Sequence, residues 1–238
     1  MKKVISMILS FVLLLSVSVT AFAASPDKTG AEYNEYVQLV EQGILAEDIT
    51  FEYWKQLKET SYALEDALEA SNEFALVYDS TDTRSTYSAY TLTKGDVFIT
   101  SGTSSAGILG HAGIAISSSY ILHIAGPGHH PATISLSKWN STYTTEGWTK
   151  VYRHTDSDVA DDAGQWASDT YKGTSAEYVI SMDLASTDET YCSKLVWQAY
   201  YYGPDEACAN GPTWGVRLPY DLPTTIHDLS LEKTYEET

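Results

Sequence analysis

Cysteine is scarce in this sequence, which contains two among 238 residues, Cys192 and Cys208. Two cysteines allow at most one disulfide, and in an exported protein that bond is the ordinary expectation. A bridge between them would close a short loop and stabilise one corner of the fold. Because it would also consume both thiols, catalysis by either cysteine is the alternative to the disulfide.

Positive charge is also scarce: 14 Lys and Arg residues stand against 32 Asp and Glu residues, for a formal net charge of −18. A surface this negative repels phosphate backbones and anionic lipid headgroups. The composition therefore argues against nucleic acid as a partner. Cationic substrates, or neutral polymers with cationic side chains, remain compatible with it.

Long apolar runs are absent after the first 23 residues. Two lysines precede an apolar stretch at 4–19, and Ala-Phe-Ala at 21–23 supplies a small-x-small cleavage site. This pattern predicts a secretory signal peptide over residues 1–23, cleaved after Ala23. The mature chain is expected to be secreted, with no stable membrane insertion.

Residues 24–80 form a helical N-terminal region by their apolar periodicity. Aromatic and aliphatic residues recur at helical spacing over 33–44, then over 51–57 after the capping residue Asp48, then over 62–77. The pattern predicts three helices without chemistry of their own. We expect them to pack on the domain that follows; a removable pro-segment is the alternative.

Residues 81–238 predict an α+β domain with an antiparallel sheet, after a polar linker at 80–86. The expected strands and helices alternate irregularly along the chain. They comprise a strand at 97–100, a loop at 101–107, a hairpin of 112–116 with 120–124, strands at 134–136 and 150–152, a helix at 159–171 and a helix from Cys192 to Gly203.

Cys192 is the candidate nucleophile. Capping residues precede it, the last being Thr190, and an apolar-periodic run follows, which predicts a helix N-terminus at the cysteine. Aligned peptide dipoles there favour an anionic sulfur. The free N–H groups could also receive the oxyanion of a tetrahedral intermediate.

His111 is the candidate base, and His123 is its candidate partner. If the turn at 117–119 pairs Ile116 with Tyr120, Gly113 lies opposite His123, and the two histidines share one face as diagonal neighbours. His123 could then fix the tautomer of His111, as the third member of a triad does. A one-residue slip would separate the two rings.

Two facing histidines could instead hold a metal ion together with Cys192 or His129. Their spacing of twelve residues matches no zinc signature, so we expect neither a metal nor a cofactor. Tyr178 is a candidate substrate-binding residue because it precedes Cys192 by one loop. A plain packing role is an equal alternative for a tyrosine in a chain with 18 of them.

The motifs together resemble the circularly permuted papain-like enzymes. The resemblance rests on Gly-Asp-Val at 95–97, Gly-His-Ala-Gly-Ile at 110–114, His123, Tyr-Cys-Ser-Lys-Leu-Val-Trp at 191–197 and Leu-Pro-Tyr-Asp-Leu at 218–222. This branch includes the YiiX-like relatives of NlpC-type cell-wall amidases and the lecithin–retinol acyltransferase relatives. In it, the histidine strand precedes the cysteine helix, as it does here.

The resemblance covers residues 90–228 and implies that Cys192 is the nucleophile, His111 the base and His123 the third polar residue. A histidine at the third place is similar to the acyltransferase branch, whereas other branches use other polar residues there. The helical region before residue 80 is not part of the resemblance.

Our leading expectation is an exported cysteine amidase or peptidase that works through a thioester acyl-enzyme. Its substrate would be a peptide or amide, with a cell-wall peptide suggested by family analogy alone. One alternative is a thiol-dependent acyltransferase or lipase acting on acyl esters. The other is a non-catalytic binding module with a Cys192–Cys208 disulfide.

Overall fold

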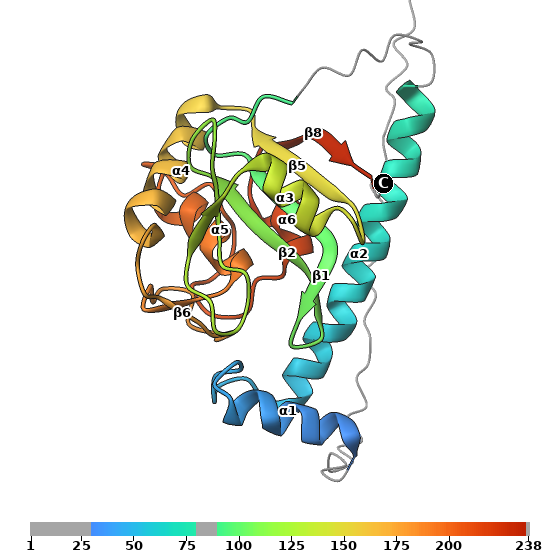
Figure 1. Ribbon diagram of the computed structural model, residues 1–238, viewed down its shortest axis with the longest axis vertical. Coiled ribbons are helices and arrows are strands. Elements are labelled where there is room, and N and C mark those ends of the chain that lie inside the picture. The colour runs from blue at the N-terminus through green and yellow to red at the C-terminus, as the bar shows by residue number, and fades with distance from the viewer. Residues whose placement is uncertain (1–29, 80–89, 237–238) are drawn as a thin grey trace, which may run out of the picture.

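The computed structural model describes residues 30–79 and 90–236 (Figure 1). These residues form a mixed α+β domain, as the sequence predicts, with helices on both faces of an antiparallel sheet. The predicted signal peptide and linker lie outside the described residues.

The sheet has six strands in the order β4-β3-β2-β1-β5-β8, and every neighbouring pair is antiparallel. Two short strands, β6 and β7, pair in parallel beside it. The bounds are β1 (Val97–Ser105), β2 (Ile108–Ala115), β3 (Ile121–His123), β4 (Ala132–Ile134), β5 (Thr149–His154), β6 (Glu177–Tyr178), β7 (Glu189–Thr190) and β8 (Leu229–Tyr235).

The sheet separates two hydrophobic clusters, because successive side chains of a strand point to opposite faces. Val97, Ile99 and Ile114 belong to the larger cluster, which includes residues of helices α4 (Ser157–Tyr171) and α5 (Cys192–Tyr202). Phe98 and Ala115 belong to the smaller cluster, which lies under helix α3 (Leu136–Tyr143). The buried residues of the central strands thus contribute alternately to the two cores.

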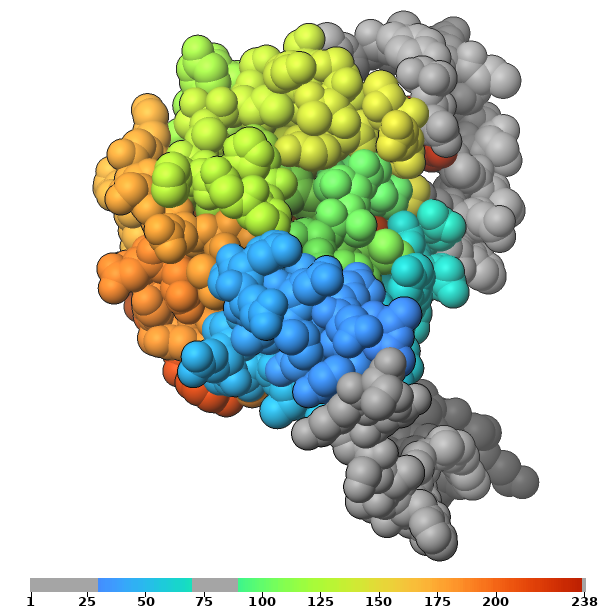
Figure 2. All heavy atoms as spheres, turned by 60° about the horizontal axis from the view of Figure 1, so that its bottom comes forward, coloured from blue at the N-terminus to red at the C-terminus, as the bar shows by residue number. Residues whose placement is uncertain are grey.

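Helix α2 (Phe51–Asp79) and the segment that links it to α1 (Ala31–Glu41) contribute to the larger core, and partly buried residues of α1 pack against it. Leu45, Ile49, Trp54 and Leu57 are buried in it together with residues of α5. Figure 2 shows the residues of α1 and early α2 lying against the later part of the chain. There the Ala46 N–H donates to the Ile180 carbonyl (3.0 Å). Loss of this region would expose apolar surface on the domain.

The prediction of two separate helices at 51–57 and 62–77 is wrong, because α2 runs without interruption from Phe51. Its first turn is capped by Thr50, whose hydroxyl accepts the Tyr53 N–H (3.2 Å). Asp48 instead accepts the Met182 N–H (3.2 Å). No glycine or proline divides the two periodic stretches, and Ser61 between them is buried and accepts the Leu109 N–H (3.2 Å).

Three further segments differ from their prediction. The expected loop at 101–107 continues β1 to Ser105, after a shift in register beyond Thr100. The strand expected at 134–136 ends at Ile134, because Ser135 caps α3 by accepting the Lys138 N–H (3.2 Å). Strand β8 went unpredicted, and it pairs with β5 at the edge of the sheet.

The C-terminal part of the domain adds a short 3-10 helix, η1 (Pro219–Asp221), and a short helix, α6 (Leu222–Thr225). Among the described helices, none has the length and apolar character needed to cross a membrane.

The buried position of Trp54 predicts that α2 unfolds together with the core of the domain. Its ring is fully buried, and its Nε1–H donates to the Ala106 carbonyl (2.8 Å). We expect W54A to lower the free energy of unfolding by about 3–5 kcal/mol, as core aromatic truncations do. On the same helix, Tyr62 is 53% exposed, so Y62A should change it by about 0.5 kcal/mol or less. Urea denaturation of both variants measures this, and equal effects would contradict it.

Candidate active site

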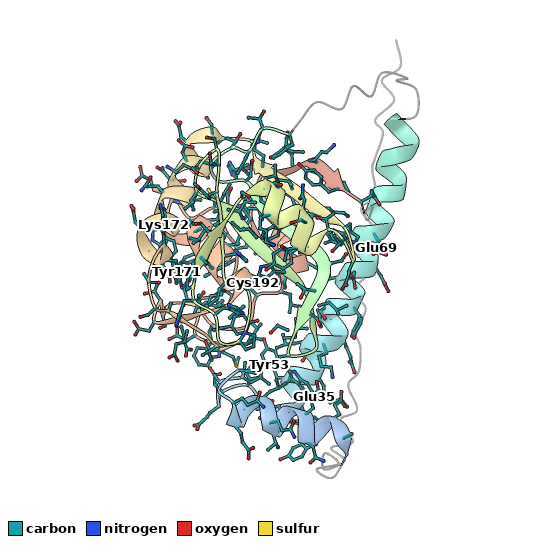
Figure 3. The ribbon with its side chains drawn as sticks, in the orientation of Figure 1. Glu35, Tyr53, Glu69, Tyr171, Lys172 and Cys192 are labelled. Atoms are coloured by element: carbon teal, nitrogen blue, oxygen red, sulfur yellow. The ribbon has the colours of Figure 1, made fainter. Side chains whose placement is uncertain are left out.

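Cys192 is the first residue of α5, so the predicted helix N-terminus is confirmed. Tyr191 is the N-cap residue, with an extended backbone (φ −139°, ψ 168°) and no side-chain cap. The expectation that Thr190 or a residue shortly before it caps this helix is therefore wrong. The first N–H groups of a helix have no intrahelical partner, and here they lie around the sulfur. Figure 3 shows Cys192 near the middle of the domain.

The Cys192 sulfur lies beside the part of β2 that β3 does not pair with. Strand β3 is shorter than β2, and their ladder stops at the pair Ile114–Leu122. The Ala115 N–H donates toward β1, to the Asp96 carbonyl (2.8 Å). By alternation, the Ala112 N–H points to the β3 side, beyond the end of that strand. The Ala112 N–H lies close enough to the Cys192 sulfur to lower the pKa of the thiol, so the thiol lies next to the residue that follows His111.

Two opposing influences act on the Cys192 thiol. Burial raises its pKa above the usual value, because a thiolate loses its hydration there. Hydrogen bonds from the backbone N–H groups of Ala112, Ser193 and Cys192 itself favour the thiolate and lower the pKa. Burial is the larger effect, so the resting group is a neutral thiol rather than the activated thiolate that a helix N-terminus alone would favour.

His111 and His123 face each other across the hairpin. The predicted register is confirmed: Ile114 pairs with Leu122, and the Ile116 N–H donates to the Tyr120 carbonyl (2.9 Å). The ring nitrogens His111 Nε2 and His123 Nδ1 are hydrogen-bonded at 2.9 Å.

Aromatic rings of α3 enclose the two histidines. Trp139 stacks on the His111 ring (centroids 5.4 Å apart, 17° between planes), and the Tyr143 centroid lies 4.8 Å away. Burial, with a smaller contribution from the nearby His123, lowers the pKa of His111 well below its usual value. Burial, with a smaller contribution from His129, lowers the pKa of His123 to about 4. Both imidazoles are therefore neutral at pH 7.

The Cys192 thiol lies next to the backbone of Ala112, the residue after His111. Within the described residues, the Cys192 and His111 side chains are not hydrogen-bonded to each other. The side chain of Ala112 faces the α5 core, so by alternation His111 faces the α3 side. If His111 Nε2–H donates to His123 Nδ1, the lone pair of His111 Nδ1 is left free. Catalytic hydrogen bonds are often unformed before substrate binds, but from these positions a direct proton transfer between the two groups would require the thiol or the imidazole to move.

A small cavity of about 20 Å³ opens beside Cys192. Tyr178 lines this cavity, close enough that a thiolate on Cys192 would raise the tyrosine's pKa further; burial raises it most. The structure therefore brings the predicted substrate-binding residue to the thiol, while its role remains a prediction. Most of the remaining wall is apolar. It consists of Ile108, Ile180, Val216, Leu218 and Pro219, with Ser105, Gly110, Tyr191, Ser193 and Arg217.

Several residues of the site were not found by sequence reasoning. Trp139 and Tyr143 lie four residues apart after the capping Ser135, a helix signal that could have located α3. Gly110 has φ +89°, and a Cβ there would lie 2.7 Å from the Tyr220 ring, so only glycine fits beside the cavity. Arg217 carries no local sequence signal.

Both cysteines are free thiols, and the disulfide of the binding-module alternative is not formed. Cys208 instead lies near the Glu206 carbonyl (Sγ to O, 3.4 Å). Within residues 30–79 and 90–236, no group of three or more His, Cys, Asp or Glu side chains is arranged to hold a metal ion.

Asp96, from the Gly-Asp-Val motif, stabilises the fold and does not lie at the thiol. Its carboxylate is fully buried and accepts hydrogen bonds from Arg153 Nε (2.7 Å), Arg153 Nη2 (2.9 Å) and the Tyr90 hydroxyl (2.6 Å). It thereby anchors β1 to β5 beneath the segment that precedes the sheet.

The raised pKa of Cys192 predicts slow alkylation at neutral pH. In a C208S variant, the rate of Cys192 modification by iodoacetamide should rise through pH 9 and show no plateau between pH 6 and 8, because the thiolate forms only above its usual pKa. Mass spectrometry of the labelled peptide measures this. A rate that is constant down to pH 6 would show a preformed thiolate and contradict the prediction.

The lowered pKa of His123 predicts an acid-dependent loss of stability. In the unfolded chain His123 binds a proton near pH 6.5, but in the folded chain only near pH 4. The stability that neutral His123 allows is therefore fully present above pH 6.5, and it is lost as the pH falls toward 4. We expect the difference in free energy of unfolding between wild type and H123Q to fall by about 3 kcal/mol over this window. A difference that does not change with pH would contradict this.

Comparisons with known proteins identify the family. A Bacillus thuringiensis protein described as an uncharacterized 30.3 kDa protein is 39% identical over 171 residues, which cover 67% of this chain and 63% of that protein. The chain thus matches less than two thirds of that relative's length. The crystal structure of metalloprotein yiiX from Escherichia coli O157:H7 aligns with a TM-score of 0.47 and 14% identity, over 62% of this chain and 99% of that one. The family described as lipoprotein N-acylation protein LnsA-like matches residues 61–235, and the chain belongs to this family.

Proposed function

We propose that this protein is a cysteine acyltransferase that moves a fatty acyl group from an ester donor, through a thioester on Cys192, to an amine. One structural observation carries the proposal: the Cys192 thiol lies in a largely apolar cavity, next to the strand that holds the hydrogen-bonded His111–His123 pair. The family description, which concerns N-acylation of lipoproteins, supports an acyl group as cargo and an amine as acceptor.

In the first half-reaction, the thiol proton passes to Nδ1 of His111 as the sulfur attacks the ester carbonyl carbon. The new C–S bond produces an oxyanion, which the N–H groups at the start of α5 would stabilise. Collapse of this intermediate breaks the C–O bond of the ester. His111 then returns the proton to the departing alkoxide, so that an alcohol leaves and a neutral thioester remains.

In the second half-reaction, an amine attacks the thioester carbonyl. A C–N bond forms, the C–S bond breaks, and the proton of the amine returns to the sulfur through His111. The sum is ester plus amine giving amide plus alcohol. Both histidines are neutral before each step, which leaves His111 able to accept a proton, and the bond to His123 selects the ring nitrogen that accepts it.

Ester donors suit the cavity better than the peptide substrates of our first expectation. Its wall contains Ile108, Ile180, Val216 and Leu218, and this apolar lining matches the hydrocarbon part of an acyl ester better than the polar backbone of a peptide. Amide hydrolysis would use the same acyl-enzyme, with water as the acceptor. Product analysis therefore separates the two functions.

Acylation of Cys192 can be tested with the p-nitrophenyl ester of a fatty acid. We expect wild type and C208S to gain the mass of one acyl group on the Cys192 peptide and to release p-nitrophenol. C192A should lose the adduct and at least about a thousandfold in rate, as nucleophile removal does. Turnover by C192A at the wild-type rate, or an adduct on another residue, would contradict the proposal.

The acceptor is identified in the same assay by adding a lipopeptide with a free α-amino group, with its N-acetylated form as the matched control. Transfer predicts an N-acyl lipopeptide with the free amine only. Free fatty acid as the sole product in both cases would assign hydrolysis instead. Cleavage of a cell-wall peptide with no acylation from esters would restore the amidase expectation.

A further inference from the structure

We propose that the Tyr143 hydroxyl donates a hydrogen bond to the oxyanion that forms when the Cys192 sulfur attacks an acyl carbonyl. This inference rests on the proposed acyl transfer by Cys192 and adds a catalytic residue to it. It depends on how Tyr143 is held at the end of α3, on its free hydroxyl and on where that hydroxyl lies relative to the thiol.

The backbone of Tyr143 is tied to the strand that pairs with the His111 strand. Tyr143 is the last residue of α3. The Thr100 hydroxyl shares its proton between the carbonyls of Tyr143 and Trp148, each 2.8 Å away. Thr100 is also the residue of β1 that pairs with His111 of β2. The end of α3 is thereby fixed to the sheet beside the candidate base.

The Tyr143 ring is held among three other rings. Its centroid lies 4.8 Å from that of Trp139, 4.8 Å from that of His111 and 5.8 Å from that of His123. The residue is 8% exposed. Close packing on several sides limits the rotation of a side chain, so the hydroxyl has a set position beside the two histidines.

The Tyr143 hydroxyl makes no hydrogen bond to any residue that the structure describes. A buried tyrosine hydroxyl usually has a partner. The Tyr220 hydroxyl, for example, donates to Glu65 (3.1 Å), and the Tyr191 hydroxyl accepts the Arg217 N–H (2.9 Å). Tyr143 therefore has a donor that a substrate can use without displacing a protein contact.

The hydroxyl lies within electrostatic range of the Cys192 sulfur. Burial raises the pKa of Tyr143 to about 12, and a thiolate on Cys192 contributes to this rise. Cys192 lines a cavity together with Gly110, which directly precedes His111. The Tyr143 ring packs on that same histidine, so thiol and hydroxyl approach the same part of β2. With its raised pKa, the hydroxyl keeps its proton at neutral pH and stays a donor.

A carbonyl held at the sulfur would meet hydrogen-bond donors from two parts of the chain. The Cys192 and Ser193 N–H groups already lower the pKa of the thiol, so they divide their effect between sulfur and oxygen. As the C–S bond forms, the π electron pair of the carbonyl moves to its oxygen, and the Tyr143 hydroxyl stabilises that charge without giving up its proton. When the carbonyl re-forms and the ester C–O bond breaks, the hydroxyl is free again.

The first test compares two reactions of Cys192, of which only one forms an oxyanion. In the C208S background, Y143F should slow acylation by the p-nitrophenyl ester about a hundred- to a thousandfold, as loss of one oxyanion donor does. Its alkylation by iodoacetamide should stay within about twofold, because displacement of iodide produces no oxyanion to stabilise. Single-turnover release of p-nitrophenol and mass spectrometry of the Cys192 peptide measure the two rates. An equal loss in both, or no loss in acylation, would overturn the proposal.

Y152F is the matched control. Tyr152 on β5 is buried to the same degree, at 7% exposed, and belongs to the larger core. Both substitutions remove one hydroxyl from a buried ring and keep the ring itself. Y152F should keep both rates. A loss in acylation as large as that of Y143F would assign the effect to the removal of any buried hydroxyl and overturn the proposal.

A binding measurement separates failure of this inference from failure of the proposed function. The Cys192 sulfur adds to the carbonyl carbon of an alkyl trifluoromethyl ketone, the thiol proton passes to His111, and the hemithioketal keeps an anionic oxygen without any acyl transfer. Y143F should weaken this adduct by the same factor by which it slows acylation, and C192A should abolish it, as measured by fluorine NMR.

Unchanged ketone affinity in Y143F would overturn the oxyanion contact. Weakened ketone binding in Y143F, with no acyl-Cys192 formed from esters by wild type, would sink the acyl transfer and leave the contact of Tyr143 with the oxyanion standing.

Discussion

The site depends on one contact, the meeting of the first residue of α5 with the edge of β2 that β3 leaves uncovered. Because the β2–β3 ladder stops at Ile114–Leu122, the Ala112 N–H has no strand partner on that side, and it lies close enough to the Cys192 sulfur to lower the pKa of the thiol. Burial of α5 from Cys192 through Tyr200 fixes the helix against the sheet. The Tyr200 hydroxyl adds a hydrogen bond to the Gly95 carbonyl (2.7 Å).

The electrostatics of the site follow from the same burial. Desolvation disfavours a charge on sulfur and on imidazole alike, so it raises the pKa of Cys192 and lowers those of His111 and His123. The resting state is a neutral thiol and two neutral rings. Helix N–H groups oppose this at the sulfur but do not outweigh it. Ionisation would therefore accompany substrate attack rather than precede it.

The cavity is built by chain segments that are distant in sequence. The segment from Val216 to Pro219 forms one wall, and Tyr53 of α2 holds it through the Val216 N–H. The family match begins at residue 61, partway along α2. Residues before it, including Trp54, nevertheless belong to the main core. In this chain the N-terminal helices therefore support the site as well as the fold.

The sequence by itself determined the α+β class, the helix start at Cys192 and the hairpin register that pairs the histidines, because each follows from local periodicity and turn chemistry. It did not determine the unbroken α2, strand β8 or helix α3, since the periodicity of 51–79 could not exclude a break and the contacts of β8 and α3 are long-range. Tertiary structure alone decided that Arg217 lies beside Cys192 and that burial outweighs the helix N-terminus at the thiol. The reason is that desolvation depends on which distant segments cover a group, and no local pattern encodes that.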